Sequence, residues 1–297
     1  MVKTLVGIPT YNGSHRVDLL LQSISMRTPR DADYRIVVCD DSGRPEHQGM
    51  TRAVVEKWKS QLPVDLIVNE KNLGLSSTWN RMIKSKDSEH CILINDDIIV
   101  ASYWLESMTY FLGNNPKAGS AGHYSYFITK DDVSQLLSSP DAIVTPRDPF
   151  TKEPNQKWTD DNEYPGRVMA PNGAFFGFRR AVYDEIGGFD PNYYTFYEES
   201  DFGTSLASHG YPTYALSWPR SWHLWSATFG SAPEIEASKV MNNSRQYYIK
   251  KWQGHFEVTH PRYMNKIPFM NVKWYYKGKG YEAVLDGDCG YYENEVK

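Results

Sequence analysis

Several features that would mark whole classes of protein are missing from this sequence of 297 residues. Its three cysteines, Cys39, Cys91 and Cys289, are far apart and lack the CxxC or CxxH spacing of a zinc site. A reducing compartment, the cytoplasm, is therefore expected. No apolar run approaches the roughly 20 residues of a membrane span, and the first apolar run is too short for a signal peptide. Any membrane association is expected to be peripheral.

An excess of positive charge is also missing. The formal net charge is −4, whereas a dedicated nucleic-acid binder usually carries a basic excess or stripe. One basic, aromatic patch at 273–277 offers groups for phosphates and bases, but a solvated hairpin is the favoured interpretation. No GxGxxG follows the first expected strand, which disfavours a dinucleotide dehydrogenase. The first loop, Pro-Thr-Tyr-Asn-Gly, also lacks the Gly-rich basic character of a nucleotidyltransferase.

Short apolar runs alternate with helical patterns over the first 120 residues. Runs this apolar, separated by helices, predict a parallel sheet that is covered on both faces. The fold class expected is therefore α/β, with βαβ wiring. The expected strands are 3–8, 34–39, 64–68 and 91–94, and the expected helices are 17–24, 47–62, 75–86 and 102–112.

Polar clusters follow all four expected strands, at 9–12, 40–42, 69–72 and 95–97. Carboxyl ends of parallel strands meet at one edge of a sheet, and open α/β sheets bind ligands at that edge. The clusters therefore predict a single site.

The rhythm breaks at 124–171, a Pro-, Asp-, Lys- and Ser-rich stretch that we interpret as a loop over the site. Beyond it the pattern predicts more strands and helices, and the Tyr- and Gly-rich tail at 273–292 suggests a hairpin. The expected strands are 172–178 and 213–217, and the expected helices are 179–186, 198–208 and 233–253.

The acidic pair Asp96-Asp97, at the end of an apolar strand, suits an oxygen-preferring cation such as Mg²⁺ or Mn²⁺. A solvated turn or a helix cap is an equally simple interpretation. His223, between two tryptophans, is a candidate to complete a metal shell, although a lone histidine is more often structural. Gly173-Ala174 allows close approach to a ligand or merely core packing.

Three carboxylates in four residues, at 198–201, open an expected helix behind the aromatic run 193–197. Aromatic walls would desolvate a carboxylate and raise its pKa toward useful basicity. The alternative is that these carboxylates only complement the helix dipole.

The ordered set of segments at 7–13, 37–43, 69–81, 93–100, 171–190 and 197–203 resembles the family 2 glycosyltransferases of the GT-A fold. The resemblance covers roughly residues 3–225. It implies a Rossmann-like, mostly parallel central sheet flanked by helices. A catalytic domain at 1–225, with an acceptor-site loop at 124–171, and a C-terminal extension at 226–297 are expected.

The resemblance also implies roles for individual residues. The nucleotide would be bound by Pro9, Thr10, Tyr11, Asp40, Asp41 and Asn72, with Asp96 near the ribose. Asp97 would hold the metal, His223 would contact metal or diphosphate, and Gly173 would border the donor sugar. The acidic motif reads Asn-Asp-Asp rather than Asp-x-Asp, and the base motif Glu-Glu-Ser-Asp leaves Glu199 and Asp201 as rival catalytic bases.

The function implied is a Mn²⁺- or Mg²⁺-dependent inverting transfer of a sugar from a nucleotide-sugar, with UDP the expected nucleotide, to an acceptor hydroxyl. A glycan is the expected acceptor. The alternatives are a hydroxylated base in DNA, which makes nucleic acid a minority partner, and a non-catalytic module that binds nucleotide-sugar or glycan. The residues leave the donor sugar and the oligomeric state open.

Overall fold

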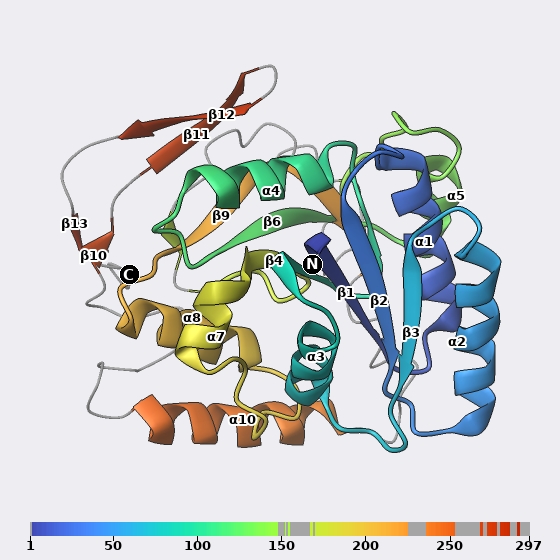
Figure 1. The fold of residues 1–297 in the computed structure, drawn as a ribbon, viewed down its shortest axis with the longest axis horizontal. Helices are drawn as coiled ribbons and strands as arrows, with labels where there is room; N and C mark the ends of the chain where they lie inside the picture. Colours follow the sequence, from blue (N-terminus) through green and yellow to red (C-terminus); the bar gives the residue numbers. More distant parts are fainter. Residues whose placement is uncertain are drawn as a thin grey trace.

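The computed structural model describes residues 2–147, 152, 154, 167–168, 170–224, 236–252 and four short strands beyond them (Figure 1). Its centre is a nine-stranded sheet in the order β3-β2-β1-β4-β8-β6-β9-β5, with β7 paired to β9. In the described residues, no helix is long and apolar enough to cross a bilayer.

The N-terminal half has the predicted βαβ wiring. β1 pairs in parallel with β2 and β4, and β2 with β3, because each crossover helix returns the chain to the same edge. The strands are β1 (Val2–Thr10), β2 (Tyr34–Asp40), β3 (Val64–Val68) and β4 (Ser88–Ile94), and the helices are α1 (Ser14–Arg27), α2 (Pro45–Trp58) and α3 (Leu75–Lys84).

The second half of the sheet is mixed. β8 is antiparallel to both β4 and β6, whereas β6 and β9 are parallel. The elements are β5 (Ile98–Ile99), α4 (Trp104–Asn114), β6 (Ser120–Phe127), β7 (Arg167–Val168), β8 (Phe175–Arg179), α7 (Arg180–Ile186), α8 (Glu198–Ser208), β9 (Thr213–His223) and α10 (Ala237–Trp252). The α/β class with a helix-flanked sheet is confirmed.

Side chains that alternate along each strand fill two separate cores. On β1 and β4, Val6 and Ile92 enter a core closed by α1, α2 and α4, while Leu5 and Cys91 enter a core closed by α3, α7 and α8. Because successive strand residues point to opposite faces, a sheet covered on both sides needs an unbroken apolar run. Unbroken apolar runs predicted these strands, and the structure shows their side chains buried on both faces of the sheet.

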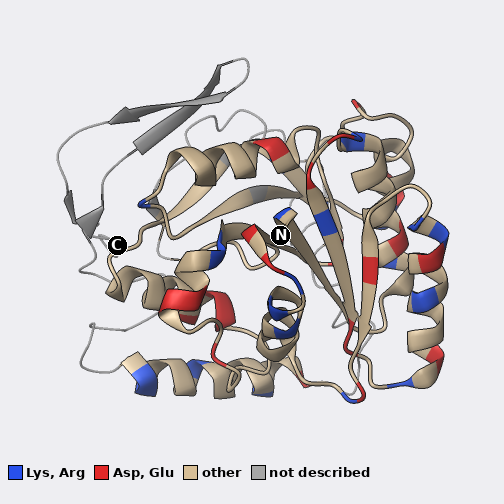
Figure 2. Ribbon diagram, in the orientation of Figure 1, with Lys and Arg blue, Asp and Glu red and all other residues tan. Residues whose placement is uncertain are grey.

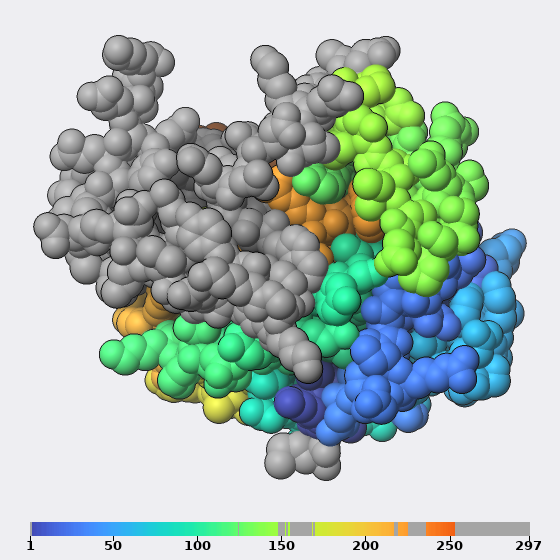
Figure 3. Space-filling view, turned by 90° about the horizontal axis from the view of Figure 1, so that it is seen from above, coloured from blue at the N-terminus to red at the C-terminus, as the bar shows by residue number. Residues whose placement is uncertain are grey.

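In the expected irregular segment at 124–171, the described residues include short regular elements. β6 continues to Phe127, and a 3₁₀ turn, η1 (Lys130–Asp132), leads into α5 (Val133–Leu136). The Arg27 guanidinium donates to the carbonyls of Leu136 (2.6 Å) and Pro140 (2.9 Å), which fastens this segment to α1. Figure 3 shows the segment, in light green, lying against the blue N-terminal part. The sequence did not predict these elements, because they are short and are held in place by tertiary contacts.

Several other boundaries also differ from expectation. The strand expected at 172–178 begins only at Phe175, because Asn172 makes a turn in which its Oδ1 accepts the N–H of Ala174 at 3.1 Å. β9 extends six residues past its expected end to His223. Near the C-terminus, β10 (Pro268–Phe269) pairs with β13 (Gly290–Tyr291), and β11 (Val272–Lys277) forms a hairpin with β12 (Gly280–Leu285), as the tail suggested.

Candidate active site

A cleft of about 710 Å³, including the part open to solvent, lies at the carboxyl edge of the parallel strands. All four predicted polar clusters supply lining residues, as does the loop before α8. The lining residues are Pro9, Thr10, Tyr11, Asp41, Asn72, Gly74, Leu75, Thr78, Asn95, Asp96, Tyr194 and Thr195.

Asp41 organises one wall of this cleft. Its carboxylate accepts hydrogen bonds from Asn69 Nδ2 (2.6 Å) and from the backbone N–H groups of Leu73 (2.8 Å) and Gly74 (3.0 Å). Burial raises the pKa of Asp41, and these bonds offset part of the rise. Asp41 therefore holds the loop before α3 through hydrogen bonds and also lines the cleft.

Asp40, its neighbour, is turned away from the cleft. Its side chain is fully buried and accepts from the Ser42 hydroxyl (2.6 Å) and the Thr51 hydroxyl (2.5 Å). The structure thus places Asp40 among the contacts that pack α2 on β2, and not on the cleft surface.

Asp96 belongs to a buried ion pair at the floor of the cleft. Its oxygens accept from Thr10 Oγ1 (2.6 Å) and from Arg16 Nε (2.9 Å) and Nη2 (3.2 Å). Arg16 also donates to the Tyr11 carbonyl at 3.3 Å. A Cβ on Gly13 would lie 2.1 Å from the carboxylate, so only glycine fits beside it. Burial raises the pKa of Asp96 to about 6, and Arg16 opposes that rise.

Asp97 and His223 come together although 126 positions separate them, because β5 pairs with the end of β9. Asp97 Oδ1 lies 3.2 Å from His223 Nε2, and the Leu224 N–H donates to the Asp97 carbonyl at 3.0 Å. Burial opposes ionisation of Asp97, but His223 outweighs it and lowers the pKa. Within the described residues, Asp97 Oδ1 is buried and accepts no hydrogen bond of good geometry.

Glu199 lies against Gly173. A Cβ on that glycine would be 3.2 Å from Glu199 Cγ, so the absence of a side chain makes room for the carboxylate. Burial raises the pKa of Glu199, and backbone N–H groups of its own helix turn offset part of the rise. Gly173, just before β8, and Glu199, in the first turn of α8, were both predicted site residues, and the structure places them side by side.

Asp201 is engaged elsewhere. Its carboxylate accepts from Lys251 Nζ (2.8 Å), Trp252 Nε1 (2.8 Å) and the Tyr193 hydroxyl (3.1 Å). The donors from α10 fill both oxygens of a side chain that is only 3% exposed. Figure 2 shows the acidic first turn of α8 in red.

Similarity to known proteins agrees with this arrangement. The profile described as "Glycosyl transferase family 2" matches residues 5–187, well over half of the chain. The chain belongs to this family. In sequence it is similar to N-acetylglucosaminyl-diphospho-decaprenol L-rhamnosyltransferase of Mycobacterium tuberculosis, with 23% identity over 223 residues, 68% of this chain and 69% of that protein. A family 2 glycosyltransferase is an enzyme, so the predicted class is confirmed.

Solved structures of glycosyltransferases share the fold. S. aureus TarS 1–349, in complex with UDP-GlcNAc, aligns with a TM-score of 0.58 at 15% identity over 87% of this chain and 69% of that one. GalNAc-T7, with UDP, GalNAc and Mn²⁺, gives 0.59 at 15% identity over 90% and 59%. The Pyrobaculum calidifontis mannosyltransferase, in complex with GDP-Man and Mn²⁺, gives 0.54 at 15% identity over 83% and 70%. The GT-A fold predicted for this glycosyltransferase is confirmed.

Three residues of the site escaped the sequence reading. Arg16 gave no signal because its partner Asp96 is 80 residues away. Tyr194 was visible only as part of an aromatic run, yet its carbonyl accepts the Leu75 N–H and the residue lines the cleft. Lys251 lies on α10, whose amphipathic spacing did not reveal which carboxylate it meets.

Proposed function

We propose that this family 2 glycosyltransferase is a metal-dependent inverting enzyme that moves a sugar from a nucleotide-sugar to an acceptor hydroxyl. The observation that carries the proposal is the convergence of three groups at one sheet edge. The first is the cleft, which Asn95 and Asp96 line. The second is the pair of Asp97, the next residue in the chain, and His223. The third is Glu199, which packs on Gly173.

The cleft is the proposed nucleotide site. Tyr11 and Pro9 offer apolar surfaces, while Thr10, Asp41 and Asn72 offer polar groups, a mixture that suits a base and ribose. We propose UDP as the nucleotide, a choice supported by the UDP and UDP-GlcNAc held in two structures of the same fold. Asp96 contributes as a fixed wall, since its oxygens already accept from Thr10 and Arg16.

Asp97 and His223 are the proposed metal ligands. A buried carboxylate oxygen without a good hydrogen bond, 3.2 Å from an imidazole nitrogen, fits a divalent cation of the Mn²⁺ type. The described residues contain no cluster of three or more such ligands, so phosphate oxygens and water would complete the shell. Bound there, the cation would stabilise charge on the departing diphosphate.

Glu199 is the proposed general base. A raised pKa gives a carboxylate more basicity, and contact with Gly173 brings it to the segment expected to border the donor sugar. It would take the proton of the acceptor hydroxyl as that oxygen bonds to the anomeric carbon and the nucleoside diphosphate leaves from the opposite face. Asp201 is the weaker candidate because its oxygens accept from Lys251, Trp252 and Tyr193.

A glycan hydroxyl is the proposed acceptor. The mycobacterial relative carries the name of an enzyme acting on a lipid-linked N-acetylglucosaminyl group, which supports a saccharide. The basic patch at 273–277, which raised the alternative of DNA, lies where side chains are outside the described residues.

The test is a thermal-shift panel of UDP-, GDP- and dTDP-sugars with and without Mn²⁺, followed by assay of nucleoside diphosphate release. A donor at about 100 times its Kd should stabilise the folded state by about 2.7 kcal/mol. Stabilisation that needs Mn²⁺ and disappears in Asp97→Ala supports the proposal. Equal stabilisation without metal contradicts the metal assignment, and binding without any nucleotide release supports a non-catalytic module instead.

A further inference from the structure

Helix α10 lies outside the segment matched to the family, yet one face of it contacts the catalytic elements. Ser244, Tyr248 and Trp252 are buried and follow helical spacing, with Lys251 beside them. In Figure 1 the helix runs along the edge of the molecule below α7 and α8.

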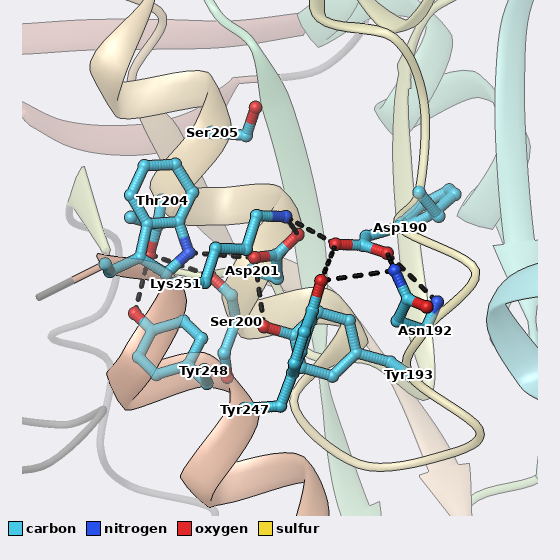
Figure 4. Close-up of polar contacts among 12 residues, drawn as sticks. Asp190, Asn192, Tyr193, Ser200, Asp201, Thr204, Ser205, Tyr247, Tyr248 and Lys251 are labelled. Atoms are coloured by element: carbon cyan, nitrogen blue, oxygen red, sulfur yellow. Dashed lines mark hydrogen bonds and ion pairs between the residues drawn. The ribbon is translucent and has the colours of Figure 1, made fainter.

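Lys251 joins two carboxylates that belong to different segments (Figure 4). Its Nζ lies 2.8 Å from Asp190 Oδ2 and 2.8 Å from Asp201 Oδ2. Asp190 precedes the aromatic loop, residues 193–197, and Asp201 lies in the first turn of α8. Burial disfavours the ammonium, but these hydrogen bonds outweigh it and raise the pKa of Lys251. Trp252 Nε1 donates to the other oxygen of Asp201 at 2.8 Å.

The same helix holds the loop that reaches the cleft. Ser244 Oγ donates to the Thr195 carbonyl at 2.8 Å, and the ring of Tyr248 lies 5.5 Å from that of Tyr197. Within this loop, the successive residues Phe196 and Tyr197 have φ values of 65° and 68°. A left-handed backbone at two successive aromatic residues is costly and persists only where surrounding contacts impose it.

We propose that Lys251 is a positioning residue for sugar transfer. It anchors the first turn of α8 through Asp201 and the start of the aromatic loop through Asp190, and so keeps Glu199 against Gly173. Glu199 and Asp201 share one helical turn, so a rotation of α8 that separates Asp201 from Lys251 also displaces Glu199. The inference rests on the proposed role of Glu199.

The test compares Lys251→Met with Lys250→Met, the exposed neighbour on the same helix. With the donor that binds best in the panel, Lys251→Met should lower kcat by about 10–100-fold, because a displacement near 1 Å costs that much. The Kd for the matching nucleoside diphosphate with Mn²⁺ should change by less than about twofold, since Lys251 does not line the cleft. Lys251→Arg should restore kcat to within about threefold because the charge is kept.

Amide hydrogen exchange over 193–201 supplies a readout that needs no donor. Faster exchange there in Lys251→Met than in Lys250→Met supports the anchor, and equal exchange together with equal kcat overturns it. Should Lys251→Met fail to fold, Lys251→Gln removes the ammonium that joins Asp190 and Asp201 but keeps a polar side chain, and an unchanged kcat and exchange in that variant also overturn the inference. Failure of the wild-type chain to turn over any donor refutes the proposed function, and exchange then decides the anchor alone.

Discussion

Glu199 and Asp201 lie two residues apart in one helix turn, yet loss of their charges should have different effects. Loss of the Asp201 charge should lower stability, and loss of the Glu199 charge should lower kcat. Asp201→Asn leaves Lys251 beside an amide that accepts fewer hydrogen bonds, and this breaks a buried ion pair. The cost should be about 3 kcal/mol, at the lower end for such a loss, because Lys251 is 31% exposed and keeps Asp190. For a chain of this size, Tm should fall by about 5 °C.

Glu199→Gln should leave Tm undiminished, because burial already disfavours the charged form of Glu199. Its kcat should fall by about 10²–10⁴-fold, the usual contribution of a general base. In the wild-type enzyme, kcat should decrease as pH falls through the raised pKa of Glu199, so the acid limb lies above pH 4.5.

Calorimetry and nucleoside diphosphate release, measured on both variants, distinguish the two roles. An Asp201→Asn variant that is inactive but as stable as the wild type would refute this reasoning, as would a Glu199→Gln variant with nearly full kcat.

Three further outcomes are expected. Asp97→Ala should keep its fold yet lose Mn²⁺-dependent stabilisation by donor in a thermal shift; retained metal dependence would point to other ligands. Gly74→Ala should weaken nucleotide binding measured by calorimetry, because φ is 82° and the new Cβ would lie 2.6 Å from the Tyr194 carbonyl; unchanged affinity would mean that the loop can shift. His123, buried and neutral with its pKa lowered to about 3 by burial, should make the folded state less stable as pH falls below 6.5, by up to about 1.4 kcal/mol per pH unit. Urea unfolding of His123→Phe should show a smaller slope, with the remainder from His90, whose pKa burial also lowers, and an equal slope would assign it to other groups.

Local patterns determined most of the fold. Apolar runs at 3–8, 34–39 and 91–94 predicted buried strands because a sheet covered on both faces leaves no polar side. Polar clusters after those runs predicted the cleft edge, since parallel strands end together. Boundaries such as the late start of β8 escaped prediction because a single side-chain bond from Asn172 sets them.

Long-range pairing decided the roles within the site. Sequence alone placed Glu199 and Asp201 on equal terms, and only the packing of α10 showed that Asp201 meets Lys251. The sequence likewise could not pair Asp97 with His223 or show that Asp96 faces Arg16. Strand pairing and a buried ion pair bring together these residues, which are far apart in the chain. The sequence by itself therefore determined the family, the sheet and its polar edge, whereas tertiary structure decided which carboxylates are already occupied by the protein's own donors.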